Sequence, residues 1–202
     1  PRGSSLEGVG ARIRRGRRRP RSGATVVVPL GKVPGLLSTV PPVVQGALSP
    51  DSSRHLSSKN LVRELFSDWP PARVLDLGCG EGDSRAFFEA TFEGAAWQGV
   101  DVADSPEVSR RSGTPPDVTT FDGIHIPHPS DTFDLVFCHQ VLEHVRYPDA
   151  LLADVVRVLA PGGWFVGAVS YLEPYHSHSL FNFTPYGAVA VLADAEIGRA
   201  HV

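Results

Sequence analysis

A glycine-rich turn after a short apolar run constrains the fold of this chain more than any other feature. The run Val74–Leu77 is apolar apart from Asp76, and it leads into Gly78-Cys79-Gly80-Glu81-Gly82. Glycine is needed where the backbone takes a positive φ or where another group approaches the main chain closely. The pattern predicts a buried strand, a tight turn and a helix from about Asp83, whose free N–H groups could face a ligand. We therefore expect a cofactor cradle.

The spacing of the three glycines separates two kinds of cofactor site. Dinucleotide sites carry G-x-G-x-x-G, whereas here the glycines alternate with other residues and Asp76 stands two residues before Gly78. The stretch from Asp76 to Gly82 resembles the first motif of the class I S-adenosylmethionine (SAM) methyltransferases, an acid followed by G-x-G-x-G. SAM has an ammonium, a carboxylate and a sulfonium instead of a pyrophosphate, so an acid beside the turn suits it. A glycine turn used only for packing is the alternative.

Further motifs follow in the family's order and extend the resemblance over about residues 74–195. The block Phe133-Asp134-Leu135-Val136 after a proline loop and the block Leu159-Ala160-Pro161-Gly162-Gly163 both resemble family motifs. Phe183-Thr184-Pro185-Tyr186-Gly187 resembles the start of a helix common in small-molecule methyltransferases. The chain thus resembles a small-molecule, type 11-like methyltransferase domain that is truncated at its C-terminus.

Apolar patterns alternate between strands and helices along the chain. Strands are predicted over about 73–77, 96–102, 118–121, 133–138 and 164–170. Helices are predicted over about 53–67, 83–91 and 148–159 and from Thr184 on, with a weak helix over 106–111. Such alternation favours a doubly wound parallel sheet covered on both faces. We expect a Rossmann-like α/β fold of about five strands in the order 3-2-1-4-5, lacking the family's last two strands and leaving one sheet edge uncovered.

The resemblance implies that SAM lies at the carboxyl ends of the strands. Asp101, which follows Gly82 by 19 residues, would accept hydrogen bonds from both ribose hydroxyls; a solvated acid at a strand end is the alternative. Asp122 and Gly123 would meet the adenine, although Asp104 and Asp117 are acids nearby. The other implied cofactor contacts are Asp76, Gly78, Cys79, Gly80, Gly82, Val102 and His139.

Histidines are the candidates for a base that would act on a hydroxyl acceptor. His139, His144 and His176 suit this role because imidazole titrates near neutral pH, and the sequence does not choose among them. Loops beyond strand ends shape substrate sites, so the aromatic and histidine-rich segment 171–187 is expected to do so here. The spacings among His125, His128, His176 and His178 match no zinc signature, and no metal site is predicted.

Charge divides the chain into a basic start and an acidic body. Residues 1–21 hold eight arginines and one acid, whereas residues 22–202 hold 11 basic and 21 acidic residues. An acidic body makes a poor nucleic-acid surface, although the arm itself could bind RNA or target an organelle. No apolar run reaches the roughly 20 residues that span a bilayer. Two cysteines favour a reducing compartment, and we expect a cytoplasmic protein.

Three segments are expected. Residues 1–50 are predicted to be a disordered, low-complexity basic arm, residues 51–195 a methyltransferase domain that is incomplete at its C-terminus, and residues 196–202 a non-native tail that resembles a translated sequencing adapter. The predicted activity is methyl transfer from SAM to an O, N or C nucleophile of a small-molecule, lipid or sugar-type acceptor. The alternatives are a module that binds SAM or its product without turnover and a nucleotide-cofactor oxidoreductase. The oligomeric state is not predicted.

Overall fold

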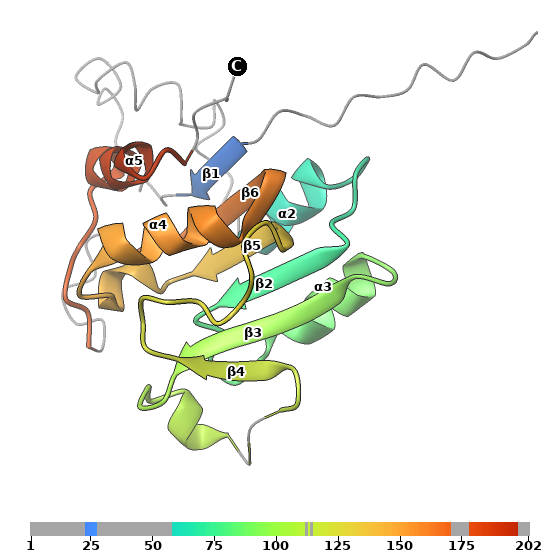
Figure 1. Cartoon of the computed structure of the whole chain (residues 1–202), viewed down its shortest axis with the longest axis horizontal. Helices are drawn as coiled ribbons and strands as arrows, with labels where there is room; N and C mark the ends of the chain where they lie inside the picture. The colour runs from blue at the N-terminus through green and yellow to red at the C-terminus, as the bar shows by residue number, and fades with distance from the viewer. Residues whose placement is uncertain (1–22, 28–57, 112, 114, 171–177, 198–202) are drawn as a thin grey trace, which may run out of the picture.

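A parallel β-sheet forms the centre of the protein (Figure 1). The computed structural model describes residues 23–27, 58–111, 113, 115–170 and 178–197. The six strands run in the spatial order β1-β6-β5-β2-β3-β4, and every neighbouring pair is parallel. Their bounds are β1 (Gly23–Val27), β2 (Arg73–Leu77), β3 (Ala96–Val102), β4 (Val118–Phe121), β5 (Phe133–His139) and β6 (Leu159–Ala168). The last five strands confirm the predicted α/β class and the predicted order.

Helices cover both faces of this sheet. On one face, α2 (Ser58–Leu65) and α3 (Ser84–Thr91) pack on side chains such as Val74 and Leu135. On the other, α4 (Pro148–Val158) and α5 (Pro185–Asp194) pack on side chains such as Leu75 and Val136. Successive strand residues point to opposite faces, so the continuous apolar runs in β2 and β5 supply both cores. Two short 3-10 helices, η2 (Val108–Arg110) and η3 (Leu142–His144), follow β3 and β5.

The strand β6 corrects one predicted boundary. A turn at Pro161-Gly162-Gly163 was expected to precede a strand over 164–170, but β6 begins at Leu159 and ends at Ala168. Leu159 pairs with Phe133 and Trp164 with Leu135, so the proline-glycine stretch bulges out within the strand. Gly162 takes a φ of +79° there, which glycine adopts easily. The turn residues are therefore an irregularity of the sheet and not its border.

The strand β1 lies within residues 1–50, the segment predicted to be a disordered arm, and that prediction stays open for the rest of the segment. Residues 23–27 pair in parallel with β6, from Gly23 opposite Trp164 to Val27 opposite Ala168. The physical reason is that β-branched residues favour strands and that β6 would otherwise present unpaired N–H and C=O groups at the sheet edge. The rest of 1–50 lies outside the described residues. The sheet edge that was expected to be uncovered thus carries a sixth strand.

The last helix begins as its capping sequence predicts. The Thr184 hydroxyl oxygen accepts a hydrogen bond from the Gly187 N–H at 3.0 Å, and Pro185 occupies the first turn. After the helix, the Ile197 N–H donates to the Leu192 carbonyl at 2.9 Å, and the Ile197 side chain is buried in the core. The non-native origin of 196–202 stays a prediction. No helix in the described part of the chain is long and apolar enough to cross a membrane.

Candidate cofactor-binding site

The glycine turn has the backbone geometry that the sequence predicts. Gly78, Gly80 and Gly82 have φ angles of +71°, +52° and +88°, which residues with a side chain rarely adopt. The N–H groups of Gly78 and Cys79 both donate to the Val100 carbonyl, at 2.8 and 3.1 Å. These two N–H groups hold the turn against β3, so they are already occupied within the protein.

Other parts of the chain approach the turn closely. A Cβ atom on Gly78 would lie 2.9 Å from one methyl group of Val141 and closer still to the other. The Cys79 side chain is buried, and a Cβ on Gly99 would lie 2.6 Å from its sulfur. Burial raises the pKa of the Cys79 thiol to about 12, so the thiol stays protonated and unreactive at neutral pH.

Asp101 is the penultimate residue of β3, lies beside the turn and is the best-placed ligand group of the site. One carboxylate oxygen accepts the Gly80 N–H at 2.7 Å, and the other accepts the Val102 N–H at 2.7 Å. Burial raises the pKa of this carboxyl, whereas the two N–H donors and Arg111 oppose that rise. Each oxygen keeps a second lone pair. The residues present therefore fit a ligand with two adjacent hydroxyls, as the ribose of SAM has.

Asp76 lies inside the protein and bonds to other side chains. The Ser84 hydroxyl donates to its carboxylate, and the Trp97 ring N–H donates to the Ser84 oxygen at 3.2 Å. Burial raises the pKa of Asp76 to about 7, so the carboxyl is about half protonated at neutral pH. The three side chains link β2, α3 and β3 behind the turn. A contact between Asp76 and SAM stays a prediction.

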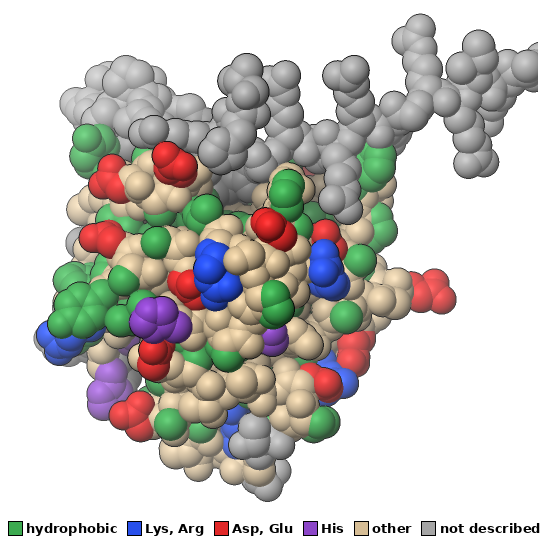
Figure 2. Space-filling model, in the orientation of Figure 1, with side chains coloured by type: hydrophobic (Ala, Val, Ile, Leu, Met, Phe, Trp, Pro, Cys, Tyr) green, Lys and Arg blue, Asp and Glu red, His purple; other side chains and the backbone are tan. Residues whose placement is uncertain are grey.

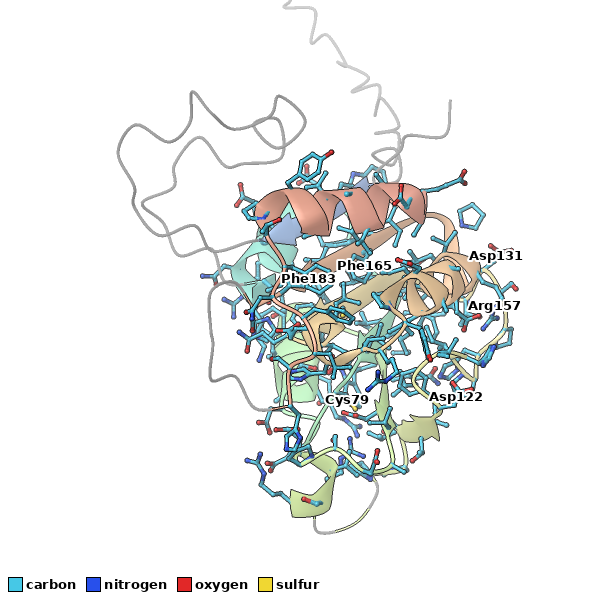
Figure 3. The ribbon with its side chains drawn as sticks, turned by 90° about the vertical axis from the view of Figure 1, so that its left-hand side faces the viewer. Cys79, Asp122, Asp131, Arg157, Phe165 and Phe183 are labelled. Atoms are coloured by element: carbon cyan, nitrogen blue, oxygen red, sulfur yellow. The ribbon has the colours of Figure 1, made fainter. Side chains whose placement is uncertain are left out.

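Asp122 follows β4 and caps its own loop. Its carboxylate accepts the N–H groups of Ile124 and His125 at 2.8 and 2.6 Å, and it lies 2.7 Å from the His125 ring nitrogen. These bonds, the one to the His125 ring first, lower the pKa of Asp122 to about 2. Figure 3 looks onto the carboxyl edge of the sheet and shows Asp122 on the side of Arg157, away from Cys79. The roles of Asp122 and Gly123 toward adenine stay predictions.

The candidate bases occupy different positions. His139 ends β5, next to the turn, because Leu77 of β2 pairs with Cys138. One of its ring nitrogens lies 2.9 Å from the Ser58 hydroxyl, and its ring stacks on Phe137. Burial and the charge of Lys59 lower the pKa of His139, so its imidazole is neutral at neutral pH. His144 is half-buried in η3, and His176 lies outside the described residues.

Arg111 is a site residue that the sequence did not indicate. Its side chain is only 6% exposed, and its Nε donates to the Gly80 carbonyl at 2.6 Å. One terminal nitrogen also donates to that carbonyl and lies 3.4 Å from the Cys79 sulfur and 3.9 Å from the Asp101 carboxylate. The nearest sequence signal was the weak helix predicted over 106–111. Helical pattern alone gives no sign that a charged side chain is buried.

Glu143 is the other polar residue that sequence reasoning missed. It is fully buried, and one carboxylate oxygen accepts the N–H and the hydroxyl of Ser170 at 2.9 and 2.7 Å. The other carboxylate oxygen has no hydrogen-bond partner among the residues that the structure describes. The Glu143 carbonyl accepts the N–H groups of Leu180 and Phe181 at 2.7 and 3.1 Å. Glu143 therefore ties η3 both to the residues after β6 and to the segment before α5.

Two hollows mark opposite edges of the described structure. One, of about 190 Å³, adjoins the glycine turn and is lined by Glu81, Arg110, Arg111, Gly113 and Pro115. The other, of about 120 Å³, lies at the amino edge of the sheet, with Trp69, Pro71 and Asp134 among its lining residues. Both are smaller than the roughly 300–1,000 Å³ typical of ligand pockets. Among the described residues no group of three or more metal-ligating side chains comes together.

Comparison with known proteins agrees with the sheet and the turn. The methyltransferase domain family matches residues 75–167. Trans-aconitate 2-methyltransferase of Methylobacterium nodulans is 34% identical over 93 residues, which are 46% of this chain and 36% of that protein. Fatty-acid O-methyltransferase of Mycolicibacterium smegmatis is 35% identical over 101 residues, 46% of this chain and 35% of that protein. The chain thus spans about a third of the length of these two relatives.

A solved structure shows the same fold. The SAM-dependent methyltransferase of Aquifex aeolicus superposes with a TM-score of 0.55 at 17% identity, over 75% of this chain and 85% of that one. Strand order, glycine turn and strand-end acid together define a Rossmann-like cofactor-binding domain. With the family match added, residues 75–167 belong to the methyltransferase domain family, in its class I SAM-dependent form.

Proposed function

We propose that the protein binds SAM and transfers its methyl group to an O, N or C nucleophile of a small molecule or lipid. The observation that carries this proposal is Asp101, whose two carboxylate oxygens are oriented by Gly80 and Val102 and each keep a lone pair beside the turn. When bound, SAM supplies a methyl group activated by the sulfonium. The protein supplies binding, alignment and exclusion of water, and alignment alone can be worth about 7–11 kcal/mol of the barrier.

His139 is the first candidate for the base. It leaves β5 at the same edge of the sheet as the turn, and its lowered pKa keeps the imidazole neutral and able to accept a proton. The Ser58 hydroxyl at 2.9 Å from one ring nitrogen fixes the ring orientation. His144 and His176 remain the other candidates for the base.

The acceptor is proposed to be a small molecule or a lipid and not a nucleic acid. The names of the relatives describe methylation of trans-aconitate and of fatty acids by those proteins. Figure 2 shows Lys and Arg side chains scattered among Asp and Glu on the visible face, with no continuous basic surface among the residues it colours. Phosphate backbones are bound by clustered positive charge, which supports the smaller acceptor.

Calorimetry with SAM and with S-adenosylhomocysteine on the full chain tests the binding step. We expect the chain to bind both, and Asp101→Ala to weaken binding at least tenfold because two hydrogen bonds to a charged acceptor are lost. The matched control is Asp194→Ala, an exposed acid at the end of α5, which should bind like the wild type. Absence of binding by the wild type, or equal affinity in Asp101→Ala, would refute the proposal.

A second measurement separates transfer from binding. Radiolabelled methyl groups from SAM are followed into organic products with a set of carboxylic acids, fatty acids and phenols as acceptors. Transfer to any of them, reduced in His139→Gln, supports the enzyme and the base together. Binding without transfer to the whole set would favour the module that binds SAM without turnover.

A further inference from the structure

The buried guanidinium of Arg111 has a role that the family resemblance does not supply. We propose that Arg111 is a positioning residue for the cofactor: it holds the Gly80 carbonyl and thereby fixes Gly80 so that its N–H orients the Asp101 carboxylate toward the ribose hydroxyls. The inference rests on the proposed SAM binding at this turn. It adds a residue that the cofactor itself need not touch.

The contacts of Gly80 on both sides carry the inference. Its N–H donates to Asp101 at 2.7 Å, and its carbonyl accepts the Nε–H of Arg111 at 2.6 Å and a second N–H from the same guanidinium. The N–H and the carbonyl belong to the two peptide planes that flank the Gly80 Cα, so the bonds to Asp101 and Arg111 together restrain its φ and ψ. Glycine has no side chain to restrain these angles itself. The bonds from Asp101 and Arg111 therefore hold Gly80 at its φ of +52°.

The segment that carries Arg111 lies against the turn. A Cβ on Gly80 would lie 3.4 Å from the Cβ of Glu107, the residue that precedes η2. The Ser105 hydroxyl accepts the Val108 N–H at 3.1 Å and so caps the start of this short helix. The chain thus leaves β3 after Val102, passes over the turn and returns Arg111 to the Gly80 carbonyl. The acid and the arginine are joined by one short, capped connection.

The electrostatics of the site favour a charged partner here. Burial of an unpaired charge is costly, and Arg111 is only 6% exposed, with the Asp101 carboxylate 3.9 Å away. The acidic and ionisable groups facing Asp101 are Asp76 on β2, Cys79 in the turn and Glu107 before η2. Arg111 is the cation among them, so it opposes the rise in the pKa of Asp101 that burial causes. An ionised carboxylate is the better acceptor for hydroxyl groups.

The neighbouring Arg110 provides a matched control. Its side chain is 61% exposed, and it pairs with Glu107 at 3.0 Å and with Glu81 at 3.8 Å. Arg110→Met removes the same charge one residue away without a contact to Gly80. Arg111→Met removes the guanidinium but keeps an apolar stem of similar length. Arg111→Lys keeps the charge and loses the planar fork that reaches the carbonyl twice.

The test measures SAM dissociation constants of the four proteins by calorimetry at pH 8 and pH 6. We expect Arg111→Met to bind about tenfold more weakly than the wild type at pH 8 and to lose more affinity than the wild type on going to pH 6. Arg111→Lys should restore the pH dependence but only part of the affinity. Arg110→Met should match the wild type within twofold. A lower melting temperature of Arg111→Met with unchanged affinity at both pH values would overturn the proposal.

A readout without cofactor keeps the inference separate from the proposed function. Carboxyl ¹³C NMR follows the titration of Asp101 in the wild type, Arg111→Met and Arg110→Met. We expect a higher pKa of Asp101 in Arg111→Met alone. If the wild type binds no SAM, the proposed function fails while this titration still decides whether Arg111 controls Asp101. Equal Asp101 titrations in all three proteins would overturn the inference. If Arg111→Met does not fold, the same measurements are made on Arg111→Lys.

Discussion

The two halves of the carboxyl edge are held together in different ways. In the half proposed to bind SAM, called the cofactor half and formed by β2, β3 and the turn after β2, side chains bond to the main chain of the turn itself, as Asp101 and Arg111 do on either side of Gly80. In the half proposed to face the acceptor, called the acceptor half and formed by β5, β6 and the described residues that follow each of them, Glu143 of η3 bonds to Ser170 after β6 and to Leu180 and Phe181 before α5. Substitutions in the cofactor half should change ligand binding, whereas those in the acceptor half should first change stability.

The largest effect is expected where the two halves meet, at Gly78 and Val141. Gly78→Ala adds a Cβ at a φ of +71° and against both methyl groups of Val141. Left-handed strain of about 1–2 kcal/mol and overpacking of about 1–3 kcal/mol together give a loss of about 2–5 kcal/mol in the free energy of unfolding. Urea denaturation measures this loss.

Two further variants separate strain from overpacking at this contact. Gly94→Ala has a φ of +77° with open space around the added Cβ, so only the strain of about 1–2 kcal/mol should appear. The double variant Gly78→Ala/Val141→Ala should recover part of the loss, because the added methyl group gains room. If Gly78→Ala cost no more than Gly94→Ala, the close packing of the two halves would be disproved.

The next largest effect is expected at Glu143 and tests the acceptor half alone. Glu143→Ala removes both hydrogen bonds accepted from Ser170 inside the core, which should lower the free energy of unfolding by about 3 kcal/mol. Glu143→Gln keeps an acceptor oxygen and should lose less. The SAM affinity of the folded protein, measured by calorimetry, should stay within twofold of the wild type. A tenfold weaker affinity in Glu143→Gln would mean that the two halves are not separable.

The pH dependence of stability tests the buried acid of the cofactor half. The pKa of Asp76 is raised from 3.8 to about 7 in the folded protein, so between these values the folded state binds more protons than the unfolded state. Stability from this group is therefore complete below about pH 4 and is lost as the pH rises through 7. Between pH 5 and pH 7 the wild type should lose about 2 kcal/mol more than Asp76→Asn. Urea denaturation of both proteins at the two pH values measures the difference, and parallel losses would contradict a raised pKa.

The sequence predicted the parts of the fold that depend on neighbouring residues. The bounds of β2, β3 and β4 match the predicted ranges. For β2 the reason is that a strand buried on both faces reads as an apolar run bordered by turn residues. The start of β6 was not predicted correctly, because Pro161-Gly162-Gly163 has the composition of a turn while the strand pairs on both sides of it. Local composition cannot show that pairing continues past a bulge.

The site was predictable only in part, for a similar reason. The turn and Asp101 lie at the ends of two strands that were predicted to be neighbours, so their closeness could be expected from the strand order. Arg111 and Glu143 gain their importance from Gly80 and Ser170, partners 31 and 27 residues away in the chain. A buried charged residue reads like a surface residue until its partner is known, so neither could be singled out from the pattern.

The smallest effect is expected at the cap of α5, which closes the acceptor half. Thr184→Ala removes the hydrogen bond from the Gly187 N–H at 3.0 Å and should lower the free energy of unfolding by about 1 kcal/mol. Thr184→Ser keeps the hydroxyl and should lower the free energy of unfolding by only a few tenths of a kcal/mol. Because α5 packs on α4, away from the turn, SAM affinity measured by calorimetry should not change in either variant. Weaker SAM binding in Thr184→Ala but not in Thr184→Ser would instead show that SAM binding depends on an ordered α5.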